Sequence, residues 1–280
     1  MDTAAISFSG ERGIEEFRSI IYAVYEKEGR SFPWRDNTDA WGILVSELML
    51  QQTQTARVVS YWKNWMEKWP SAAHLNNASL EEVLRQWSGL GYNRRARYLK
   101  ECAGIIVRDM GGKVPVTPEA LARLPGIGPY TAGAVACFAG NYPAVFIETN
   151  IRAVMLHFFF NGQDGISDGE IMPLLDAVLD RSNPRKWYWA LMDYGAALKK
   201  LAANPNRRSA HYSRQSSFKG SFRQIRGSLI RALVSGGPAA AEELRKRLDV
   251  PADEKDFYRA LEALGKEAMV AEEAGTYRIK

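Results

Sequence analysis

Apolar side chains recur three and four positions apart through most of the first two thirds of the chain, which is the period of an amphipathic helix. No sustained apolar–polar alternation, the mark of a half-buried strand, occurs there. Helix starts are marked by Thr117, Pro118 and Glu119, and by Ser79 with Glu82, a pair that resembles a capping box. The pattern predicts an all-α body with helices over 14–27, 41–52, 56–68, 80–87, 94–109, 118–123, 130–139 and 151–159.

The pattern changes near residue 223. From there it predicts helices over 223–234, 240–248 and 253–266, and then strand-like runs over 268–271 and 277–279. Three helices followed by a hairpin are typical of a small winged-helix domain, and helix-turn-helix units often enter DNA grooves. Because 11 basic and 10 acidic residues nearly balance over 223–280, a structural or protein-contact role is an equal alternative.

Positive charge gathers between these two parts. The 280-residue chain carries a net charge of +5, which by itself is weak evidence for a polyanionic partner. Between Asp193 and Glu242 there is no acidic residue, and Arg207 and Arg208 lie among Asn, Ser and Tyr residues that suit contacts with phosphates. The alternative is a flexible linker, because Pro205 and Gly220 mark a domain boundary, and both can hold. Nine basic residues lie in this segment: Lys199, Lys200, Arg207, Arg208, Arg214, Lys219, Arg223, Arg226 and Arg231.

Several classes of protein are excluded by composition. The longest apolar stretches fall well short of the roughly 20 residues that cross a bilayer, and the N-terminus has no apolar core of a signal peptide. A cytoplasmic protein is therefore expected. Two cysteines, Cys102 and Cys137, and three histidines lack the spacing of a zinc or iron–sulfur site. We expect no metal or other cofactor, although magnesium held by carboxylates stays open.

The segment Leu124-Pro125-Gly126-Ile127-Gly128 lies between two predicted helices. Two glycines let a backbone approach a ligand closely, and the amides that begin the second helix suit a phosphate oxygen. The turn predicts a grip on a nucleic-acid backbone that reads no bases. An ordinary glycine-rich connection is the alternative. A basic cluster, Arg94, Arg95, Arg97 and Lys100, is by itself typical of an exposed helix face.

Three segments carry a family resemblance. LPGIGPYTAGAVACFA resembles the helix-hairpin-helix motif of the DNA glycosylase superfamily that includes endonuclease III. SELMLQQTQTARVVSYW and WSGLGYNRRARYL resemble the MutY-like adenine glycosylase branch. The similarity covers about residues 30–200 in the family's order. It implies the two-lobed, all-α HhH-GPD fold with double-stranded DNA between the lobes, base flipping and hydrolysis of an N-glycosidic bond.

The resemblance, the basic segment and the change of pattern together divide the chain into a glycosylase domain at 1–204, a basic linker at 205–222 and a winged-helix-like domain at 223–280. A six-helix barrel lobe is expected at about 34–136, and a second lobe at 1–33 plus 137–204. We expect a monomer that acts in the cytoplasm, at the nucleoid, on double-stranded DNA with a mispaired or damaged base. Its C-terminal domain can contact another repair protein.

Two carboxylates are candidates for the chemistry, because release of a purine is easiest when an acid protonates the leaving base and an anion stabilises the cationic sugar. Glu47 lies in an otherwise apolar run, where burial would raise its pKa and keep it able to donate a proton. Its place in SELMLQQ resembles that of the family's catalytic glutamate. The alternative is the exposed face of an amphipathic helix.

Glu148 is the second candidate, at the start of a helix before Thr149 and Asn150. The family has aspartate at the matching place, so the longer side chain keeps the charge but moves it. Alternatively, Glu148 only favours a helix N-terminus. Tyr130 stands where lyase-active relatives have a lysine that forms a Schiff base, so the resemblance implies a monofunctional hydrolase with catalytic residues Glu47, Glu148 and Tyr130. Core packing is the alternative for Tyr130.

Residues that contact DNA also follow from the resemblance. Gln51 and Gln52 match residues that wedge into the opened duplex. Further contacts are expected from Tyr92, Arg94, Leu124, Gly126, Gly128, Thr131, Asn150, Arg207 and Arg208. The chain departs from the family by lacking the four cysteines of an iron–sulfur cluster after Leu191–Ala196, and by a winged-helix-like unit in place of the domain that recognises 8-oxoguanine.

The leading hypothesis is a monofunctional glycosylase that releases adenine opposite 8-oxoguanine or G. An alternative on the same fold is release of mismatched thymine or uracil, or of another modified base. A third reading, from another class, is a DNA-binding protein without catalysis.

Overall fold

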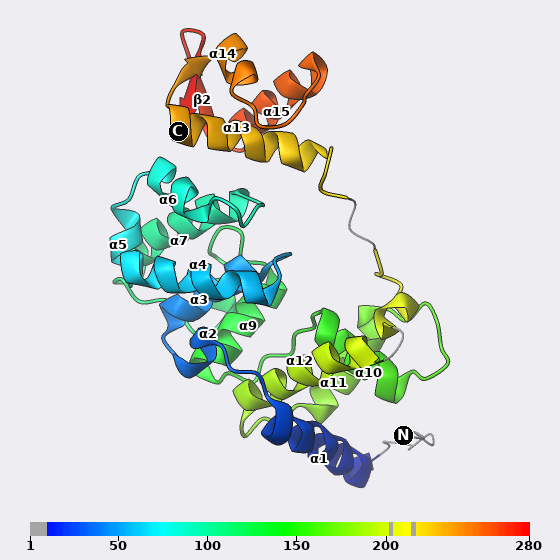
Figure 1. Ribbon diagram of the computed structural model, residues 1–280. Helices are drawn as coiled ribbons and strands as arrows, with labels where there is room; N and C mark the ends of the chain where they lie inside the picture. The colour runs from blue at the N-terminus through cyan, green and yellow to red at the C-terminus, as the bar shows by residue number, and fades with distance from the viewer. Residues whose placement is uncertain (1–9, 202–203, 214–216) are drawn as a thin grey trace. The chain divides into compact units, whose positions relative to one another are not determined.

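The computed structural model describes residues 10–201, 204–213 and 217–280. Residues 1–9 of the expected second lobe and Arg214 of the basic segment lie outside the described residues. The all-α prediction is confirmed for the body of the protein (Figure 1). Its elements are α1 (Gly10–Glu28), α2 (Pro33–Asp36), α3 (Ala40–Leu50), α4 (Thr55–Lys68), α5 (Ala72–Asn76), α6 (Leu80–Trp87), α7 (Arg94–Asp109), α8 (Pro118–Leu121), α9 (Pro129–Gly140), α10 (Thr149–Phe159), α11 (Asp168–Val178), α12 (Pro184–Leu201) and η1 (Pro205–Arg208).

The best-marked helices match their predictions. The ranges 80–87 and 94–109 coincide with α6 and α7, and the capping box of Ser79 and Glu82 is formed. The pattern did not mark α2 and α5, which have four and five residues and are too short for a helical period to show. The pattern also missed α11 and α12. α11 carries Pro173 inside the helix, where sequence rules predict a break.

Contacts group the chain into two units, and each is described by itself. One unit comprises 1–43, 115–123 and 127–214, and the other comprises 44–114, 124–126 and 215–280. The boundary falls inside α3. The predicted domain boundaries stay a prediction. No helix among the described residues is long and apolar enough to cross a bilayer.

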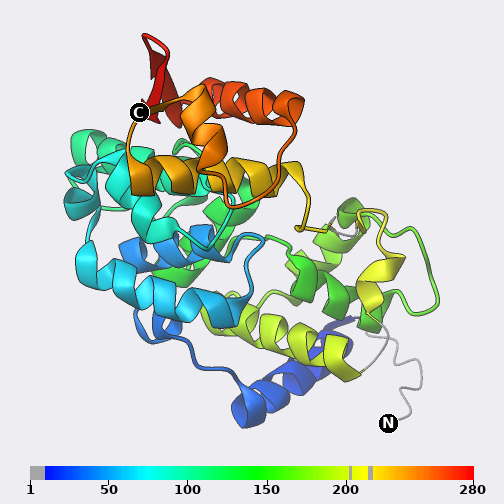
Figure 2. The same cartoon turned by 45° about the horizontal axis from the view of Figure 1, so that its top comes forward.

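In the first unit, α10 packs along α12, as Figures 1 and 2 both show. Phe17 of α1 fills the core between Phe158 and Trp187, at ring distances of 5.1 and 5.7 Å. Gly195 lets α12 pass close to the start of α10, because a Cβ there would lie 2.2 Å from the carbonyl oxygen of Asn150. The position of Asn150 and its neighbours therefore depends on a glycine of α12.

In the second unit, three tryptophans form a cluster in which Trp65 meets Trp69 and Trp87 at ring distances of 4.6 and 5.5 Å. The unit also holds the C-terminal elements, which are shown in orange to red in Figure 2. Arg85 of α6 donates to the carbonyl oxygen of Val234 at 2.8 Å and so links the two groups of helices. The C-terminal elements are α13 (Phe222–Gly236), β1 (Ala239–Ala240), α14 (Ala241–Lys246), α15 (Glu254–Lys266), β2 (Val270–Glu273) and β3 (Thr276–Ile279).

The three predicted C-terminal helices and the terminal hairpin are present. Strands β2 and β3 pair antiparallel, with Val270 opposite Ile279, and the unpredicted β1 pairs with β3. The hairpin turns at Ala274 and Gly275, whose φ angles of 49° and 78° suit a tight two-residue turn. The three strands form a small sheet in the order β1-β3-β2, as in the predicted winged-helix-like arrangement.

Candidate active site and DNA-contact residues

Glu47 lies on a helix that is buried all round. Residues 41–49 of α3 are all buried, and Glu47 is only 5% exposed. A helix that is apolar on every side belongs to a core. The interpretation of Glu47 as part of an exposed amphipathic face is therefore wrong, and its side chain is buried with the rest of this helix.

The turns that follow α3 and precede α7 carry the predicted wedge residue Gln52 and the predicted DNA-contact residue Tyr92. Gln52 is exposed with a φ of 57°, and Tyr92 is 41% exposed with a φ of 47°. Both backbones are in the left-handed region, which glycine favours and other residues adopt at a cost. Side chains are therefore kept at two turn positions that glycine would occupy with less strain.

Tyr92 and Arg94 also contact the C-terminal domain, within the same unit. The Tyr92 hydroxyl is hydrogen-bonded to Arg223 of α13, whose guanidinium lies 5.5 Å from the Tyr92 ring centroid. Arg94 lies 3.8 Å from Glu267, which also pairs with Arg226. The C-terminal elements thus contact two residues that the sequence predicts to bind DNA.

The helix-hairpin-helix turn has the conformation that its glycines predict. Gly126 has a φ of 75°, and a Cβ there would lie 2.3 Å from Cδ2 of Tyr98. Gly128 is the N-cap of α9 and is exposed, whereas the side chains of Leu124 and Thr131 are buried. Leu124 and Thr131 can therefore offer DNA only their backbone, and the amides that follow Pro129 at the start of α9 stay the predicted phosphate site.

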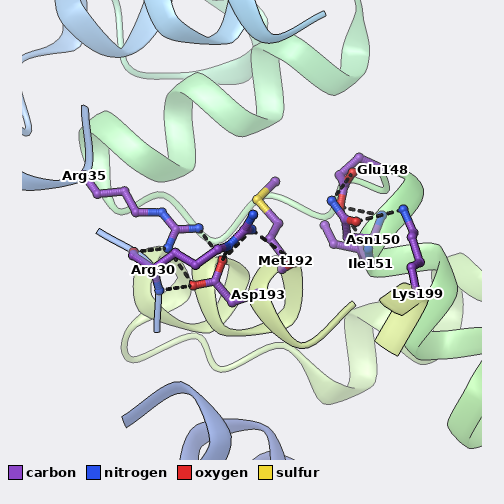
Figure 3. Close-up of polar contacts among 8 residues, drawn as sticks. All are labelled: Arg30, Arg35, Glu148, Asn150, Ile151, Met192, Asp193 and Lys199. Carbon is purple, nitrogen blue, oxygen red and sulfur yellow. Dashed lines mark hydrogen bonds and ion pairs between the residues drawn. The ribbon is translucent and has the colours of Figure 1, made fainter. Parts of the chain in front are cut away.

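Glu148 is the N-cap of α10. Its Oε1 accepts from the backbone amides of Asn150 and Ile151 at 2.7 and 2.9 Å, and its Oε2 accepts from the side-chain amide of Asn150 at 3.2 Å. Lys199 reaches from α12 and donates to Oδ1 of Asn150 at 2.8 Å (Figure 3). Burial lowers the pKa of Lys199 below its ordinary 10.5, although the nearby charge of Glu148 opposes this. Helix capping is thus one role of Glu148, and its carboxylate lies in a cluster with an amide and an amine.

Tyr130 packs on aromatic neighbours within the first unit. Its ring meets Phe146 edge-on at 5.8 Å, and Phe146 stacks on Tyr188 at 3.9 Å. Tyr130 is half-buried, so the ring takes part in packing as the structural alternative proposed. A chemical role of its hydroxyl stays a prediction.

Asp193 ties α12 to the residues that follow α1. Arg35 binds its two carboxylate oxygens at 2.8 Å each, and the Arg30 amide donates to Oδ2 at 2.7 Å (Figure 3). Burial would raise the pKa of Asp193, but the bonds and charge of Arg35 and the bonds from Arg30 outweigh it and hold this pKa below 3.8.

Replacing Asp193 by asparagine should therefore lower the free energy of unfolding by about 2 kcal/mol at pH 7. Because the folded-state pKa is depressed, this contribution is complete above the unfolded pKa of about 3.9 and is lost as pH falls through the lower folded-state value. Urea unfolding of parent and Asp193→Asn between pH 7 and 3 measures it. A gap between the two proteins that stays constant over that range would contradict the assignment.

The segment after α12 is packed rather than extended. In η1, Asn206 is buried and donates to the carbonyl oxygen of Thr149 at 2.9 Å. The Arg208 guanidinium donates to the carbonyl oxygens of Leu156, at 2.7 Å, and Phe160, and so satisfies the end of α10. The first residues of the predicted linker are thus part of the first unit, whereas Arg207 is exposed.

Arg207 and Arg208 should respond differently to substitution. Arg208→Gln should lower the free energy of unfolding by about 1 kcal/mol, because carbonyl groups of α10 lose their donor. Arg207→Gln should leave stability unchanged and reduce the slope of log affinity against log salt by about one, as expected for one lost phosphate contact. Thermal unfolding and duplex binding at several salt concentrations measure both. An unchanged slope in Arg207→Gln would remove Arg207 from the DNA-contact set.

The candidate residues divide between the two units. Gly128, Tyr130, Thr131, Glu148, Asn150, Arg207 and Arg208 belong to the first. Glu47, Gln51, Gln52, Tyr92, Arg94, Leu124 and Gly126 belong to the second.

An iron–sulfur cluster does not fit the residues present. The clusters of the resembling family need four cysteines, whereas this chain has Cys102 on α7 and Cys137 on α9, in different units. Within the described ranges, no group of three or more His, Cys, Asp or Glu side chains could hold a metal ion.

The sequence of this chain is similar to a known protein family and to individual known proteins. Residues 45–181 match the family described as HhH-GPD superfamily base excision DNA repair protein. An adenine DNA glycosylase of Mycobacterium tuberculosis is 36% identical, in an alignment that covers 94% of this chain and 92% of that protein. The chain belongs to the HhH-GPD superfamily. An adenine DNA glycosylase of Mus musculus is 39% identical over 68% of this chain, but that alignment covers only 39% of the mouse protein.

Solved structures of the superfamily share the fold. A thermostable thymine-DNA glycosylase matches with a TM-score of 0.61 and 25% identity, over 69% of this chain and 90% of its own. An endonuclease III trapped on DNA matches with a TM-score of 0.55 and 19% identity, over 65% and 84% of the two chains. The predicted HhH-GPD fold is confirmed.

Sequence reasoning missed three residues that hold candidate residues in place, each within its own unit. Lys199 and Asn206 were noted only as one more basic charge and as part of a polar stretch, yet both bond residues 149–150 beside Glu148. Arg95 was expected on an exposed face and is only 6% exposed. Its position one helical turn from Tyr92, a predicted DNA-contact residue, was the available signal.

Proposed function

We propose that this protein is a monofunctional adenine DNA glycosylase that removes a flipped, mispaired adenine in base excision repair. The observation that carries the proposal is Glu47, a carboxylic acid buried in an apolar helix. It lies within the segment that matches the superfamily, and the relatives that align over nearly the whole chain are adenine DNA glycosylases.

In the proposed reaction, Glu47 gives its proton to the leaving adenine as the bond between its ring nitrogen and C1′ of the deoxyribose breaks. The Glu148 carboxylate stabilises the positive charge that develops on the sugar. Water then adds its oxygen to C1′, and the proton it loses restores the acid. The products are free adenine and an abasic site.

Cleavage of the DNA strand is not part of the proposal. Tyr130 offers a hydroxyl where a lyase would need an amine, so it forms no Schiff base with the sugar. Lys199 is an amine, but it is engaged as a donor to Asn150. The abasic site is therefore the final product.

Binding to DNA is shared between two kinds of contact. The first amides of α9 and the exposed Arg207 hold phosphates without reading sequence. Gln51, Gln52 and Tyr92 enter the duplex where the adenine leaves its stack. The protein works as a monomer on cytoplasmic DNA, and its C-terminal domain is available to a second repair protein.

A panel of duplexes tests the function. Single-turnover reactions on A opposite 8-oxoguanine, A opposite G, T opposite G, U opposite G and matched pairs are split with alkali to reveal abasic sites. We expect adenine release, strand cleavage only with alkali, and no protein–DNA adduct after borohydride. Release of a pyrimidine alone would establish the alternative substrate, release of no base would favour the non-catalytic reading, and a borohydride adduct would disprove the monofunctional assignment.

A further inference from the structure

Arg95, at the start of α7, binds both wedge turns. One terminal nitrogen donates to the carbonyl oxygens of Leu48 and Met49, at 2.9 Å each, and of Gln51. The other terminal nitrogen lies 3.1 Å from Oγ1 of Thr53. The same guanidinium therefore holds the last turn of α3 and the turn that follows it.

The second turn is held by the same group. The second terminal nitrogen of Arg95 also donates to the carbonyl oxygens of Leu90, at 3.3 Å, and Gly91, at 2.9 Å, while Nε lies 3.4 Å from the oxygen of Tyr92. The guanidinium lies 5.3 Å from the ring centroid of Trp87 and 5.5 Å from that of Tyr92. Residues 90–92 thus converge on the group that binds residues 48–53.

The burial of the Arg95 guanidinium has a cost in free energy. Burial lowers the pKa of Arg95 to about 10, and its acceptors are backbone carbonyls and one hydroxyl rather than a carboxylate. A buried charge loses hydration, and its hydrogen bonds must offset that loss. In return, the buried guanidinium fixes the positions of two turns relative to each other, although they lie about 40 residues apart in sequence.

We propose that Arg95 is a positioning residue that locks the Gln51–Gln52 turn to the Tyr92 turn, so that both enter the duplex as one rigid wedge. The proposal rests on the proposed function, which makes these turns the DNA wedge. Arginine is needed because its planar fork can span two turns, whereas the ammonium of lysine is a single point of donors. Arg95→Lys therefore keeps the charge and removes the bridge.

The first test measures the coupling without activity. Hydrogen exchange is followed in peptides that report the amides of Thr53 and Leu90, which close their turns on the carbonyls of Leu50 and Trp87 at 3.1 Å each. In Arg95→Lys, exchange should speed up by about tenfold at both turns. The control is Leu75→Ala, which lowers stability by opening a cavity at a fully buried position of α5, in the same unit but outside the segments that form the two turns.

The second test measures single-turnover adenine release at saturating enzyme, at a temperature where both variants are folded. Arg95→Lys should release adenine about tenfold more slowly or worse, with affinity for a matched duplex within about threefold of the parent, while Leu75→Ala stays near the parent rate. Two results would overturn the proposal: exchange at the two turns no faster than in Leu75→Ala, or faster exchange at both turns with unchanged release. If the parent releases no base, the proposed function fails, and the exchange measurement still decides whether Arg95 couples the turns.

Discussion

Glu47→Gln will slow single-turnover adenine release by about a thousandfold and leave affinity for the mispaired duplex within a few fold of the parent. Glutamine has nearly the same shape as the protonated acid but no proton to give to the leaving base. Glu47 is buried in α3, so the variant keeps the packing of the helix and changes only the acid. The measurement is base release under excess enzyme, with duplex binding measured in parallel.

The matched control is Glu67→Gln, which makes the same chemical change at an exposed position of α4 in the same unit. It should release adenine at the parent rate. If Glu47→Gln also does so, Glu47 is not the acid. If it loses duplex affinity and stability to the same degree as activity, Glu47 is a structural residue.

Glu148→Gln will slow adenine release by about a hundredfold with a loss of less than about 1 kcal/mol of stability. The glutamine oxygen can still accept from the amides of Asn150 and Ile151, so the helix cap survives while the negative charge is removed. Asp253→Asn is the control, because Asp253 caps α15 by accepting from the amide of Asp256 at 2.7 Å. It removes a capping charge elsewhere and should leave the rate unchanged.

Glu148→Asp keeps the negative charge but shortens the side chain. It restores the residue that the family has at this place and should release adenine at least about tenfold faster than Glu148→Gln. If Glu148→Gln and Glu148→Asp both release adenine at the parent rate, Glu148 only caps α10. The sugar cation would then need another source of negative charge.

The sequence predicted those features that a local pattern determines. α6 and α7 were placed to the residue because a capping box and a clear apolar period mark them. The turn at Gly126 was predicted because its glycines have few other uses. Glu47 was singled out because a carboxylate in an apolar run has a local cost that needs an explanation.

The features that were missed depend on contacts between distant segments. Arg95 looks like its neighbour Arg94 in sequence, and only the fold brings the carbonyls of residues 48–51 to its guanidinium. Likewise, Asn206 was one more polar residue of a linker until its bond to the Thr149 carbonyl placed it in the first unit. α11 was missed for the opposite reason, because the local rule against a proline such as Pro173 inside a helix was overridden by packing.

The 3-10 helix η1 stands in the region where the family resemblance places a cluster held by four cysteines. Hydrogen bonds from Asn206 and Arg208 to α10 hold it in place. These bonds do not depend on a redox state or on iron supply. The stability of this region should therefore be insensitive to chelators and oxidants.

The left-handed backbone at Gln52 lowers the stability of the fold at a residue that we propose to contact DNA. A non-glycine residue with a φ of 57° costs free energy that glycine would not pay. Libraries selected only for resistance to heat would therefore enrich glycine at position 52, and each such variant would have lost one of the two glutamines that we propose as the wedge. A selection for a more durable protein therefore has to include base release, because position 52 is one that we propose to open the duplex.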